Sequence, residues 1–249
     1  MGAERESVIG GGVVGTADAL DLTMDAHVHT GFAAGRDSVG VIVSAADQAG
    51  LAALTFADQV TPDTAWLPAF ADAVRRAQSR TEMVLRVAAE VEVVQPDGWL
   101  AWPADLGHLE VVSVAVSRLP LPGAILAARD VRAMLATGEL SPEQVAEGLV
   151  TATIQGVERA SRYAPTQLAR PLSLLAQVGL DDAVVTPDLL SALASACRET
   201  GTVVEVSEAW RSPTARLVAM LRAARVPLVP ASDARYAAEV GRWQYLRRV

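Results

Sequence analysis

The feature that most constrains the fold of this chain is the alternation of short apolar runs with amphipathic helical patterns from residue 23 onward. Helix starts between the runs are marked by a Ser141-Pro142-Glu143-Gln144 capping box and by Thr186-Pro187. We expect a helix after every strand but the last, which predicts parallel strands joined by crossover helices. The predicted fold is an α/β protein, a distorted (β/α)7 barrel, with strands at residues 23–29, 51–58, 83–94, 109–117, 167–171, 202–208 and 226–233.

One domain accounts for this pattern: residues 23–249 form the barrel, and residues 1–22 form a lead-in segment. Residues 10–15 (GGGVVG) match the glycine spacing of a dinucleotide-binding turn. That turn needs a full strand before it and a long helix after it, so that the helix N-terminus faces the pyrophosphate. Neither is present around residues 10–15, and we assign them to the lead-in.

Composition narrows the class of protein. The 249 residues are 51% hydrophobic, which is enough for a large core. The 21 basic residues, all arginine, against 29 acidic ones give a net charge of −8 without a basic stripe, which argues against a nucleic-acid partner. Cys197 is the only cysteine, and no apolar run reaches the roughly 18 residues of a membrane span. We expect a soluble, cytoplasmic protein, and the composition is compatible with a homodimer.

Polar side chains fall at the ends of the predicted strands, where parallel barrels carry their chemistry. His27 and His29 lie two apart on the first strand, so their side chains leave the same face roughly 7 Å apart. The sixth strand carries Glu205 and Glu208, of which only the inward-facing one can contribute. Buried carboxylates are costly unless paired or metal-bound, so convergence of such residues indicates a site. The other candidates at strand ends are Asp58, Glu90, Ser117, Arg170 and Asp233.

These motifs resemble the polymerase and histidinol phosphatase (PHP) superfamily over roughly residues 24–241. Residues 25–30 (DAHVHT) resemble its first motif, and residues 54–59 (LTFADQ), which contain Asp58, its second. Residues 112–117 and 231–235 (ASDAR) resemble the third and fourth, and Glu90 matches the bridging glutamate. The resemblance implies a distorted barrel that carries a metal-dependent phosphoesterase site with three metals.

The chain departs from the family at four positions that usually carry histidine: Gln59, Ser117, Arg170 and Arg235. By the resemblance, the first metal takes the paired histidines, the glutamate and the aspartate, which are retained, whereas the second and third depend largely on the lost histidines. We therefore expect one divalent ion at most, zinc, manganese or iron, or no metal at all. The predicted metal ligands are His27, His29, Glu90 and Asp233.

The remaining candidates have two interpretations each. Arg170 and Arg235 carry planar donor forks that could bind an anionic substrate in catalysis, or they could pair with Asp233 or Glu90 and seal the barrel. Trp99 and Trp102 follow a strand and could line a substrate pocket or cap the barrel mouth. Asp58 is the retained acid of the second motif and a candidate catalytic group.

Three functions fit these residues. The first is a metal-dependent hydrolase, a phosphoesterase acting on a small anionic molecule, with one metal that activates water and arginines in place of the lost metals. The second is a non-catalytic barrel that binds a ligand or a partner. The third is a specialised biosynthetic reaction on the same scaffold. A two-metal amidohydrolase, which also has a histidine pair on its first strand, fits poorly because the chain has no lysine.

Overall fold

A computed structural model describes residues 19–249. The glycine-rich residues 10–15 and most of the predicted lead-in lie outside this range. Seven parallel strands form one sheet in the order β1-β2-β3-β4-β7-β8-β9. All seven predicted strands are present, so the barrel prediction is confirmed. Their bounds are β1 Met24–Val28, β2 Ala53–Gln59, β3 Val84–Glu92, β4 Val111–Ala115, β7 Thr166–Leu168, β8 Val203–Ser207 and β9 Leu228–Ala231.

The first and last strands meet and nearly close the barrel. The Asp233 amide donates to the carbonyl of His27 at 2.9 Å, and the His29 amide donates to the carbonyl of Ala234 at 2.9 Å. Val28 and Ala234 form a parallel bridge. This closure matters for function because it brings the histidine pair of the first strand beside the aspartate that follows the last one.

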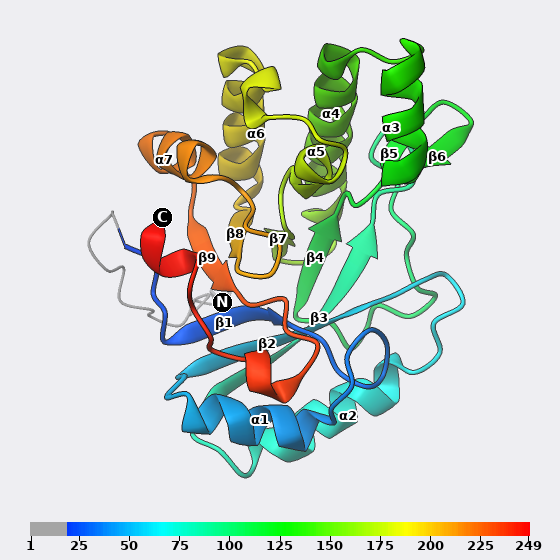
Figure 1. Cartoon of the computed structure of the whole chain (residues 1–249). Coiled ribbons are helices and arrows are strands. Elements are labelled where there is room, and N and C mark those ends of the chain that lie inside the picture. Colours follow the sequence, from blue (N-terminus) through cyan, green and yellow to red (C-terminus); the bar gives the residue numbers. More distant parts are fainter. Residues whose placement is uncertain (1–18) are drawn as a thin grey trace, which may run out of the picture.

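Seven α-helices surround the strands, with α1 and α2 on one side and α4, α6 and α7 on the other (Figure 1). The predicted capping box is present, since the Ser141 side chain accepts from the Gln144 amide and the Gln144 side chain accepts from the Ser141 amide. Thr186 caps α6 by accepting from the Leu189 amide. The helices are α1 Val39–Gln48, α2 Leu67–Gln78, α3 Ala128–Thr137, α4 Pro142–Ala160, α5 Ser173–Gln177, α6 Pro187–Thr200 and α7 Ala215–Ala223.

The connections differ from the prediction in three places. No helix follows β3, because residues 93–110 contain two prolines, which lack the N–H for helical hydrogen bonds, and two glycines, which disfavour a helix. A hairpin of β5 (Leu119–Leu121) and β6 (Ala124–Leu126) precedes α3, with Pro122-Gly123 at its turn and Gly123 at φ +78°. The last helix also begins later than the Ser212-Pro213 dipeptide predicts, because its cap is Thr214, whose side chain accepts from the Leu217 amide.

The helices pack on the barrel through the faces that their sequences predict. In α1, for example, Val39, Ile42, Val43 and Ala46 are buried, at the spacing of one helical stripe. Within residues 19–249, every helix is too short or too polar to cross a lipid bilayer. The apolar packing outside the strands leaves the polar side chains of the strand ends to meet inside the barrel.

Candidate metal centre

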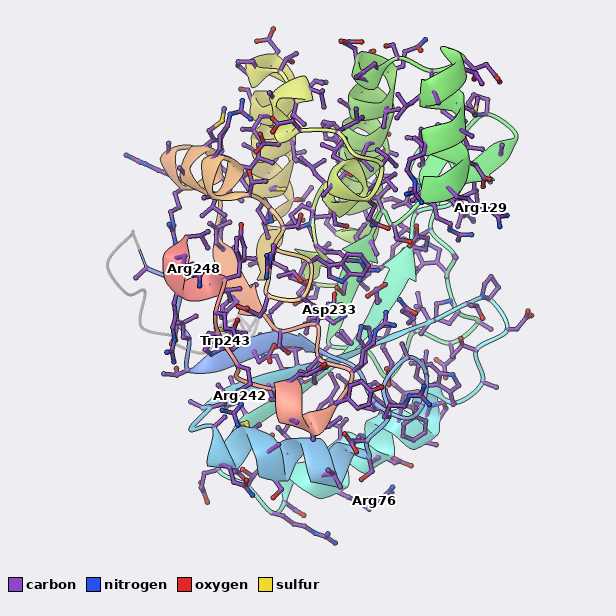
Figure 2. All side chains as sticks on the ribbon, in the orientation of Figure 1. Arg76, Arg129, Asp233, Arg242, Trp243 and Arg248 are labelled. Carbon is purple, nitrogen blue, oxygen red and sulfur yellow. The ribbon has the colours of Figure 1, made fainter. Side chains whose placement is uncertain are left out.

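A buried polar cluster fills one end of the barrel. Its side chains come from the ends of β1, β2, β3 and β8 and from the segments that follow β7 and β9. Figure 2 shows Asp233 near the middle of the molecule, where the strands converge. Each residue of the cluster is at most 4% exposed, and the members are His27, His29, Asp58, Glu90, Arg170, Glu205 and Asp233.

The structure brings three of these residues together as a group that could hold a metal ion. The ligand atoms of His27, His29 and Glu90 lie within 4.8 Å of one another. Glu90 Oε2 is 3.2 Å from His27 Nε2 and 4.0 Å from His29 Nε2. His27 Nε2 and His29 Nδ1 have no hydrogen-bond partner among the described residues. Two imidazoles and a carboxylate are suitable donors for zinc, manganese or iron.

The orientation of His27 is set by Glu205 on β8. Glu205 Oε1 lies 2.9 Å from His27 Nδ1 and also accepts from Ser113 Oγ at 3.1 Å and from Gln167 Nε2 at 2.8 Å. Gln167 Nε2 is itself fixed by the carbonyl of Ala26 at 2.9 Å. The carboxylate thus favours a proton on Nδ1 and turns Nε2 toward Glu90, the ring orientation of many metal-binding histidines.

Two aspartates hold His29. Its Nε2 is 3.0 Å from Asp233 Oδ1, and its Nδ1 is 3.6 Å from Asp58 Oδ1. Asp58 is fixed in turn by Thr30, whose amide donates to Oδ1 at 2.9 Å and whose hydroxyl donates to Oδ2. Asp58 therefore lies beside the histidine pair, in contact with its ring and with the backbone of the first loop.

Arg170 lies between two of the carboxylates. Its two terminal nitrogens donate to Glu90 at 2.6 and 2.5 Å, and one of them is 3.5 Å from Asp233 Oδ2. The guanidinium lies over the Trp210 ring, 5.5 Å from its centroid. Gln59 adds a donor to Glu90 Oε1 at 3.1 Å. Of the two interpretations of Arg170, ion pairing with Glu90 and Asp233 is the contact that the structure displays.

Charge dominates the energetics of the cluster. Burial alone raises the pKa of Glu90, but Arg170 outweighs it and holds that pKa well below its ordinary value. Burial also raises the pKa of Asp233, whereas the hydrogen bond from His29 and the nearby cations lower it to about 2. Burial lowers the pKa of His27, yet the carboxylates of Glu205 and Glu90 hold it well above its ordinary value. These directions share one cause, the close pairing of buried carboxylates with buried cations, because each charge favours the ionised form of its opposite partner.

Backbone strain accompanies the cluster. Arg170 has φ +33°, Asp233 has φ +55°, and Arg211, in the loop after β8, has φ +50°. Side chains with a β-carbon rarely adopt this left-handed region, at a cost of about 1–3 kcal/mol each. Three such residues around one end of the barrel favour a functional rather than a purely structural role for that end.

The other predicted site residues lie outside the buried cluster. Arg235 is exposed, in the wall of a pocket that reaches Asp233. Trp99 is 47% exposed, with Arg159 over its ring, and Trp102 packs against Tyr163. Ser117 donates to Glu92 at 2.8 Å from both its amide and its hydroxyl. The roles predicted for Arg235, Trp99 and Trp102 stay predictions.

Part of the polar network was not identified from the sequence. Glu205 faces inward, whereas Glu208 accepts from the amides of Tyr245 and Leu246 in the C-terminal segment. Gln167 and Ser113 were not singled out at all. The sequence left open which of Glu205 and Glu208 faces inward, and the feature that distinguishes Glu205 is its place in the middle of an apolar strand, where burial demands a partner.

Comparisons with known proteins support the fold. No protein-family model matches the sequence, and no curated protein matches it. A structure from Listeria monocytogenes, named as a histidinol phosphatase, superimposes with a TM-score of 0.69 at 12% identity, over 88% of this chain and 97% of that one. Histidinol phosphate phosphatase from Lactococcus lactis, solved with zinc, L-histidinol and phosphate, gives 0.65 at 14% identity, over 90% and 88%. The resemblance to the PHP superfamily is thus confirmed at the level of the fold.

Proposed function

We propose that this protein is a metal-dependent hydrolase, a phosphoesterase that acts on a small anionic molecule with the help of one divalent ion. The observation that carries the proposal is the group of His27, His29 and Glu90, whose ligand atoms lie within 4.8 Å of one another inside a buried, negatively charged cluster. Asp233, 3.0 Å from His29 Nε2, is the fourth proposed ligand. The similar fold of the zinc-containing Lactococcus lactis enzyme is consistent with this assignment.

The residues present fit a metal. Among residues 19–249, His27 Nε2 is buried without a hydrogen-bond partner, and Glu205 holds Nδ1 of the same ring so that Nε2 faces Glu90. Zinc, manganese and iron all accept such nitrogen and carboxylate donors. When bound, such an ion would lower the pKa of a coordinated water from 15.7 toward about 7 and supply hydroxide at neutral pH.

The protein's own residues would position the substrate. Arg170 uses both terminal nitrogens on Glu90, but its Nε has no hydrogen-bond partner among the described residues. A phosphoryl oxygen is a suitable acceptor for that buried donor. Asp58 keeps the His29 ring oriented through its contact with Nδ1, and Arg235 offers a second positive charge at the edge of the adjoining pocket.

Elemental analysis of protein purified without chelators or an affinity metal column tests the metal. We expect about one equivalent of zinc, manganese or iron, lost in His27→Ala and retained in His108→Ala. His108 is the matched control because it pairs with Asp105 at the surface, outside the buried cluster. Retention of the ion in His27→Ala would contradict the assigned site.

A phosphomonoester panel then tests the reaction. We expect release of phosphate from small anionic esters by the metal-loaded protein, abolished in Asp233→Asn and unchanged in His108→Ala. Activity that survives both His27→Ala and Asp233→Asn would contradict the proposal, because neither the ion nor its ligands would then take part.

A second candidate function is a metal-free barrel that binds a ligand without turnover. The double contact of Arg170 with Glu90 favours it, because a guanidinium already neutralises the carboxylate that a metal would use. Protein that takes up no ion after reconstitution, yet is stabilised by small anions, would establish this candidate and exclude hydrolysis at this site.

A further inference from the structure

A pocket lined by arginines adjoins the metal centre. The loops that follow β8 and β9, together with the C-terminal segment, enclose a pocket of about 510 Å³. Ser232 and Asp233 contribute to it, so it opens directly onto one of the proposed metal ligands. This volume lies in the range of small-molecule sites. Three arginines line the pocket: Arg211, Arg235 and Arg242.

These three arginines carry unpaired charge. None of their side chains forms an ion pair or a hydrogen bond with any residue in the range 19–249. Such a concentration of cations is unusual on a chain with net charge −8. Unpaired guanidinium groups that face a cavity are ready donors for carboxylate or phosphate oxygens.

The carboxylates that share the pocket are already engaged. Glu208 accepts from the amides of Tyr245 and Leu246, and Glu239 Oε2 accepts from the amides of Arg235 and Tyr236. Asp233 is held by His29 and Arg170. Backbone and side-chain donors thus occupy oxygens of these acidic groups, and the arginine side chains remain available to a ligand.

The wall that carries Arg211 is held by several contacts. The Trp210 amide donates to Ser207 Oγ at 3.3 Å, and the Ser207 amide donates to the carbonyl of Ser212 at 2.7 Å. The Ser212 hydroxyl donates to the carbonyl of Pro171, close to Arg170. Since the Trp210 ring packs under the Arg170 guanidinium, the pocket wall and the buried cluster are in direct contact.

We propose that this pocket binds a second anionic group of the substrate, a carboxylate or a further phosphate, on the end that does not react. The inference rests on the proposed hydrolysis at the adjoining centre and names its substrate class: phosphoesters whose alcohol part is itself anionic. The carbon skeleton would lie against Trp210 and Tyr236, and the arginines would fix the far end. Figure 2 labels two of the lining residues, Asp233, which is buried, and Arg242 on the C-terminal segment, which is exposed.

Equilibrium binding of matched probes to the full chain tests the inference. O-phosphoserine and O-phosphoethanolamine differ by one carboxylate, and fructose 1,6-bisphosphate and fructose 6-phosphate differ by one phosphate. Because a charged hydrogen bond contributes about 1.5–3 kcal/mol, we expect at least about tenfold tighter binding of the more anionic member of one pair. The pair that shows the preference identifies the second group as a carboxylate or a phosphate.

Variants of the pocket arginines test whether this pocket causes the preference for the more anionic probe. Arg211→Gln and Arg242→Gln should each reduce it to less than about threefold, since each removes one of the charged donors. Arg129→Gln is the matched control, because the Arg129 side chain is exposed on α3 outside the pocket, and this variant should retain the preference for the more anionic probe. Equal affinities within both pairs, or a preference that survives both pocket variants, would overturn the inference. Phosphate release, measured in the same samples, reports separately on hydrolysis. A binding preference for the more anionic probe without phosphate release would support the pocket inference and refute the catalytic proposal.

Discussion

Replacement of Arg170 by methionine tests the charge balance of the metal centre most directly. Arg170 is 4% exposed, and its two terminal nitrogens contact Glu90 at 2.6 and 2.5 Å. Methionine keeps an apolar stem to pack on Trp210 and removes the charge. Glu90 would then retain only Gln59 and His27 as neighbours with donor groups.

The expected loss of stability follows from burial. Removing one partner of a buried ion pair leaves an uncompensated charge and costs about 3–5 kcal/mol. The left-handed backbone at position 170 is strained with arginine and with methionine alike, so it does not contribute to the difference in stability between the two proteins. The pKa of folded Glu90 lies well below its ordinary value because Arg170 outweighs the effect of burial. The pair's contribution is therefore fully present at neutral pH and is lost as the pH falls through that lowered pKa.

Urea unfolding at pH 7.5 in the presence of a chelator measures this loss. We expect Arg170→Met to unfold about 3–5 kcal/mol more easily than the wild type, and Arg170→Met/Glu90→Gln to recover part of that, with a coupling energy of about 1–3 kcal/mol. Zinc should stabilise Arg170→Met more than the wild type, because the freed carboxylate can bind the ion. A single variant within about 0.5 kcal/mol of wild type would refute the reasoning on stability. If zinc stabilises the wild type and Arg170→Met equally, that result would refute the inference that Arg170 and the ion compete for Glu90.

Three further predictions test other parts of the structure. Glu205→Gln should weaken zinc binding about 10- to 100-fold in competition with a chromogenic chelator, because it removes the charge that orients His27; unchanged affinity would contradict that role. Burial raises the pKa of Asp25 from 3.8 to about 6, so the folded state loses up to about 3 kcal/mol as pH rises from about 3 to about 7, a dependence that Asp25→Asn should abolish in unfolding curves. Gly98→Ala should lower the free energy of unfolding by more than about 2 kcal/mol, because the added β-carbon would lie 2.3 Å from the backbone of Gln155. Gly179→Ala is the control and should cost only about 1 kcal/mol, because its added β-carbon would have no described atom within 4 Å.

The sequence predicted the barrel well because the apolar periodicity of a parallel barrel is local. Each strand is a short apolar run, and residues such as Val39, Ile42 and Val43 mark the buried face of a helix without reference to the rest of the chain. The histidine pair could be placed for the same reason, since His27 lies on β1 and His29 follows directly after its last residue. The Pro122-Gly123 turn of the missed hairpin is also a local pattern and could have been identified.

The arrangement around Arg170 could not be predicted in the same way. Its left-handed backbone, at φ +33°, is one that no arginine propensity favours, and its two interpretations depended on which carboxylates lay within reach. The pocket arginines are a clearer case. Arg211 and Arg242 come from the loop after β8 and from the C-terminal segment, and only the folded chain places both around one cavity with Asp233.

The buried cluster is hard to explain as a device for stability alone. A barrel that needed only to be sealed would gain from apolar side chains, because replacing buried ion pairs by well-packed hydrophobic residues is often neutral or stabilising. This end instead retains four buried carboxylates against one buried guanidinium. It also holds four buried polar atoms without partners among the described residues: His27 Nε2, His29 Nδ1, Glu205 Oε2 and Arg170 Nε. In native proteins such atoms require an explanation. A cation bound by the histidines and an anion bound by the arginine would account for the excess negative charge and for two of the four atoms, His27 Nε2 and Arg170 Nε. For this reason we favour a metal-dependent reaction on an anionic substrate over a sealed barrel.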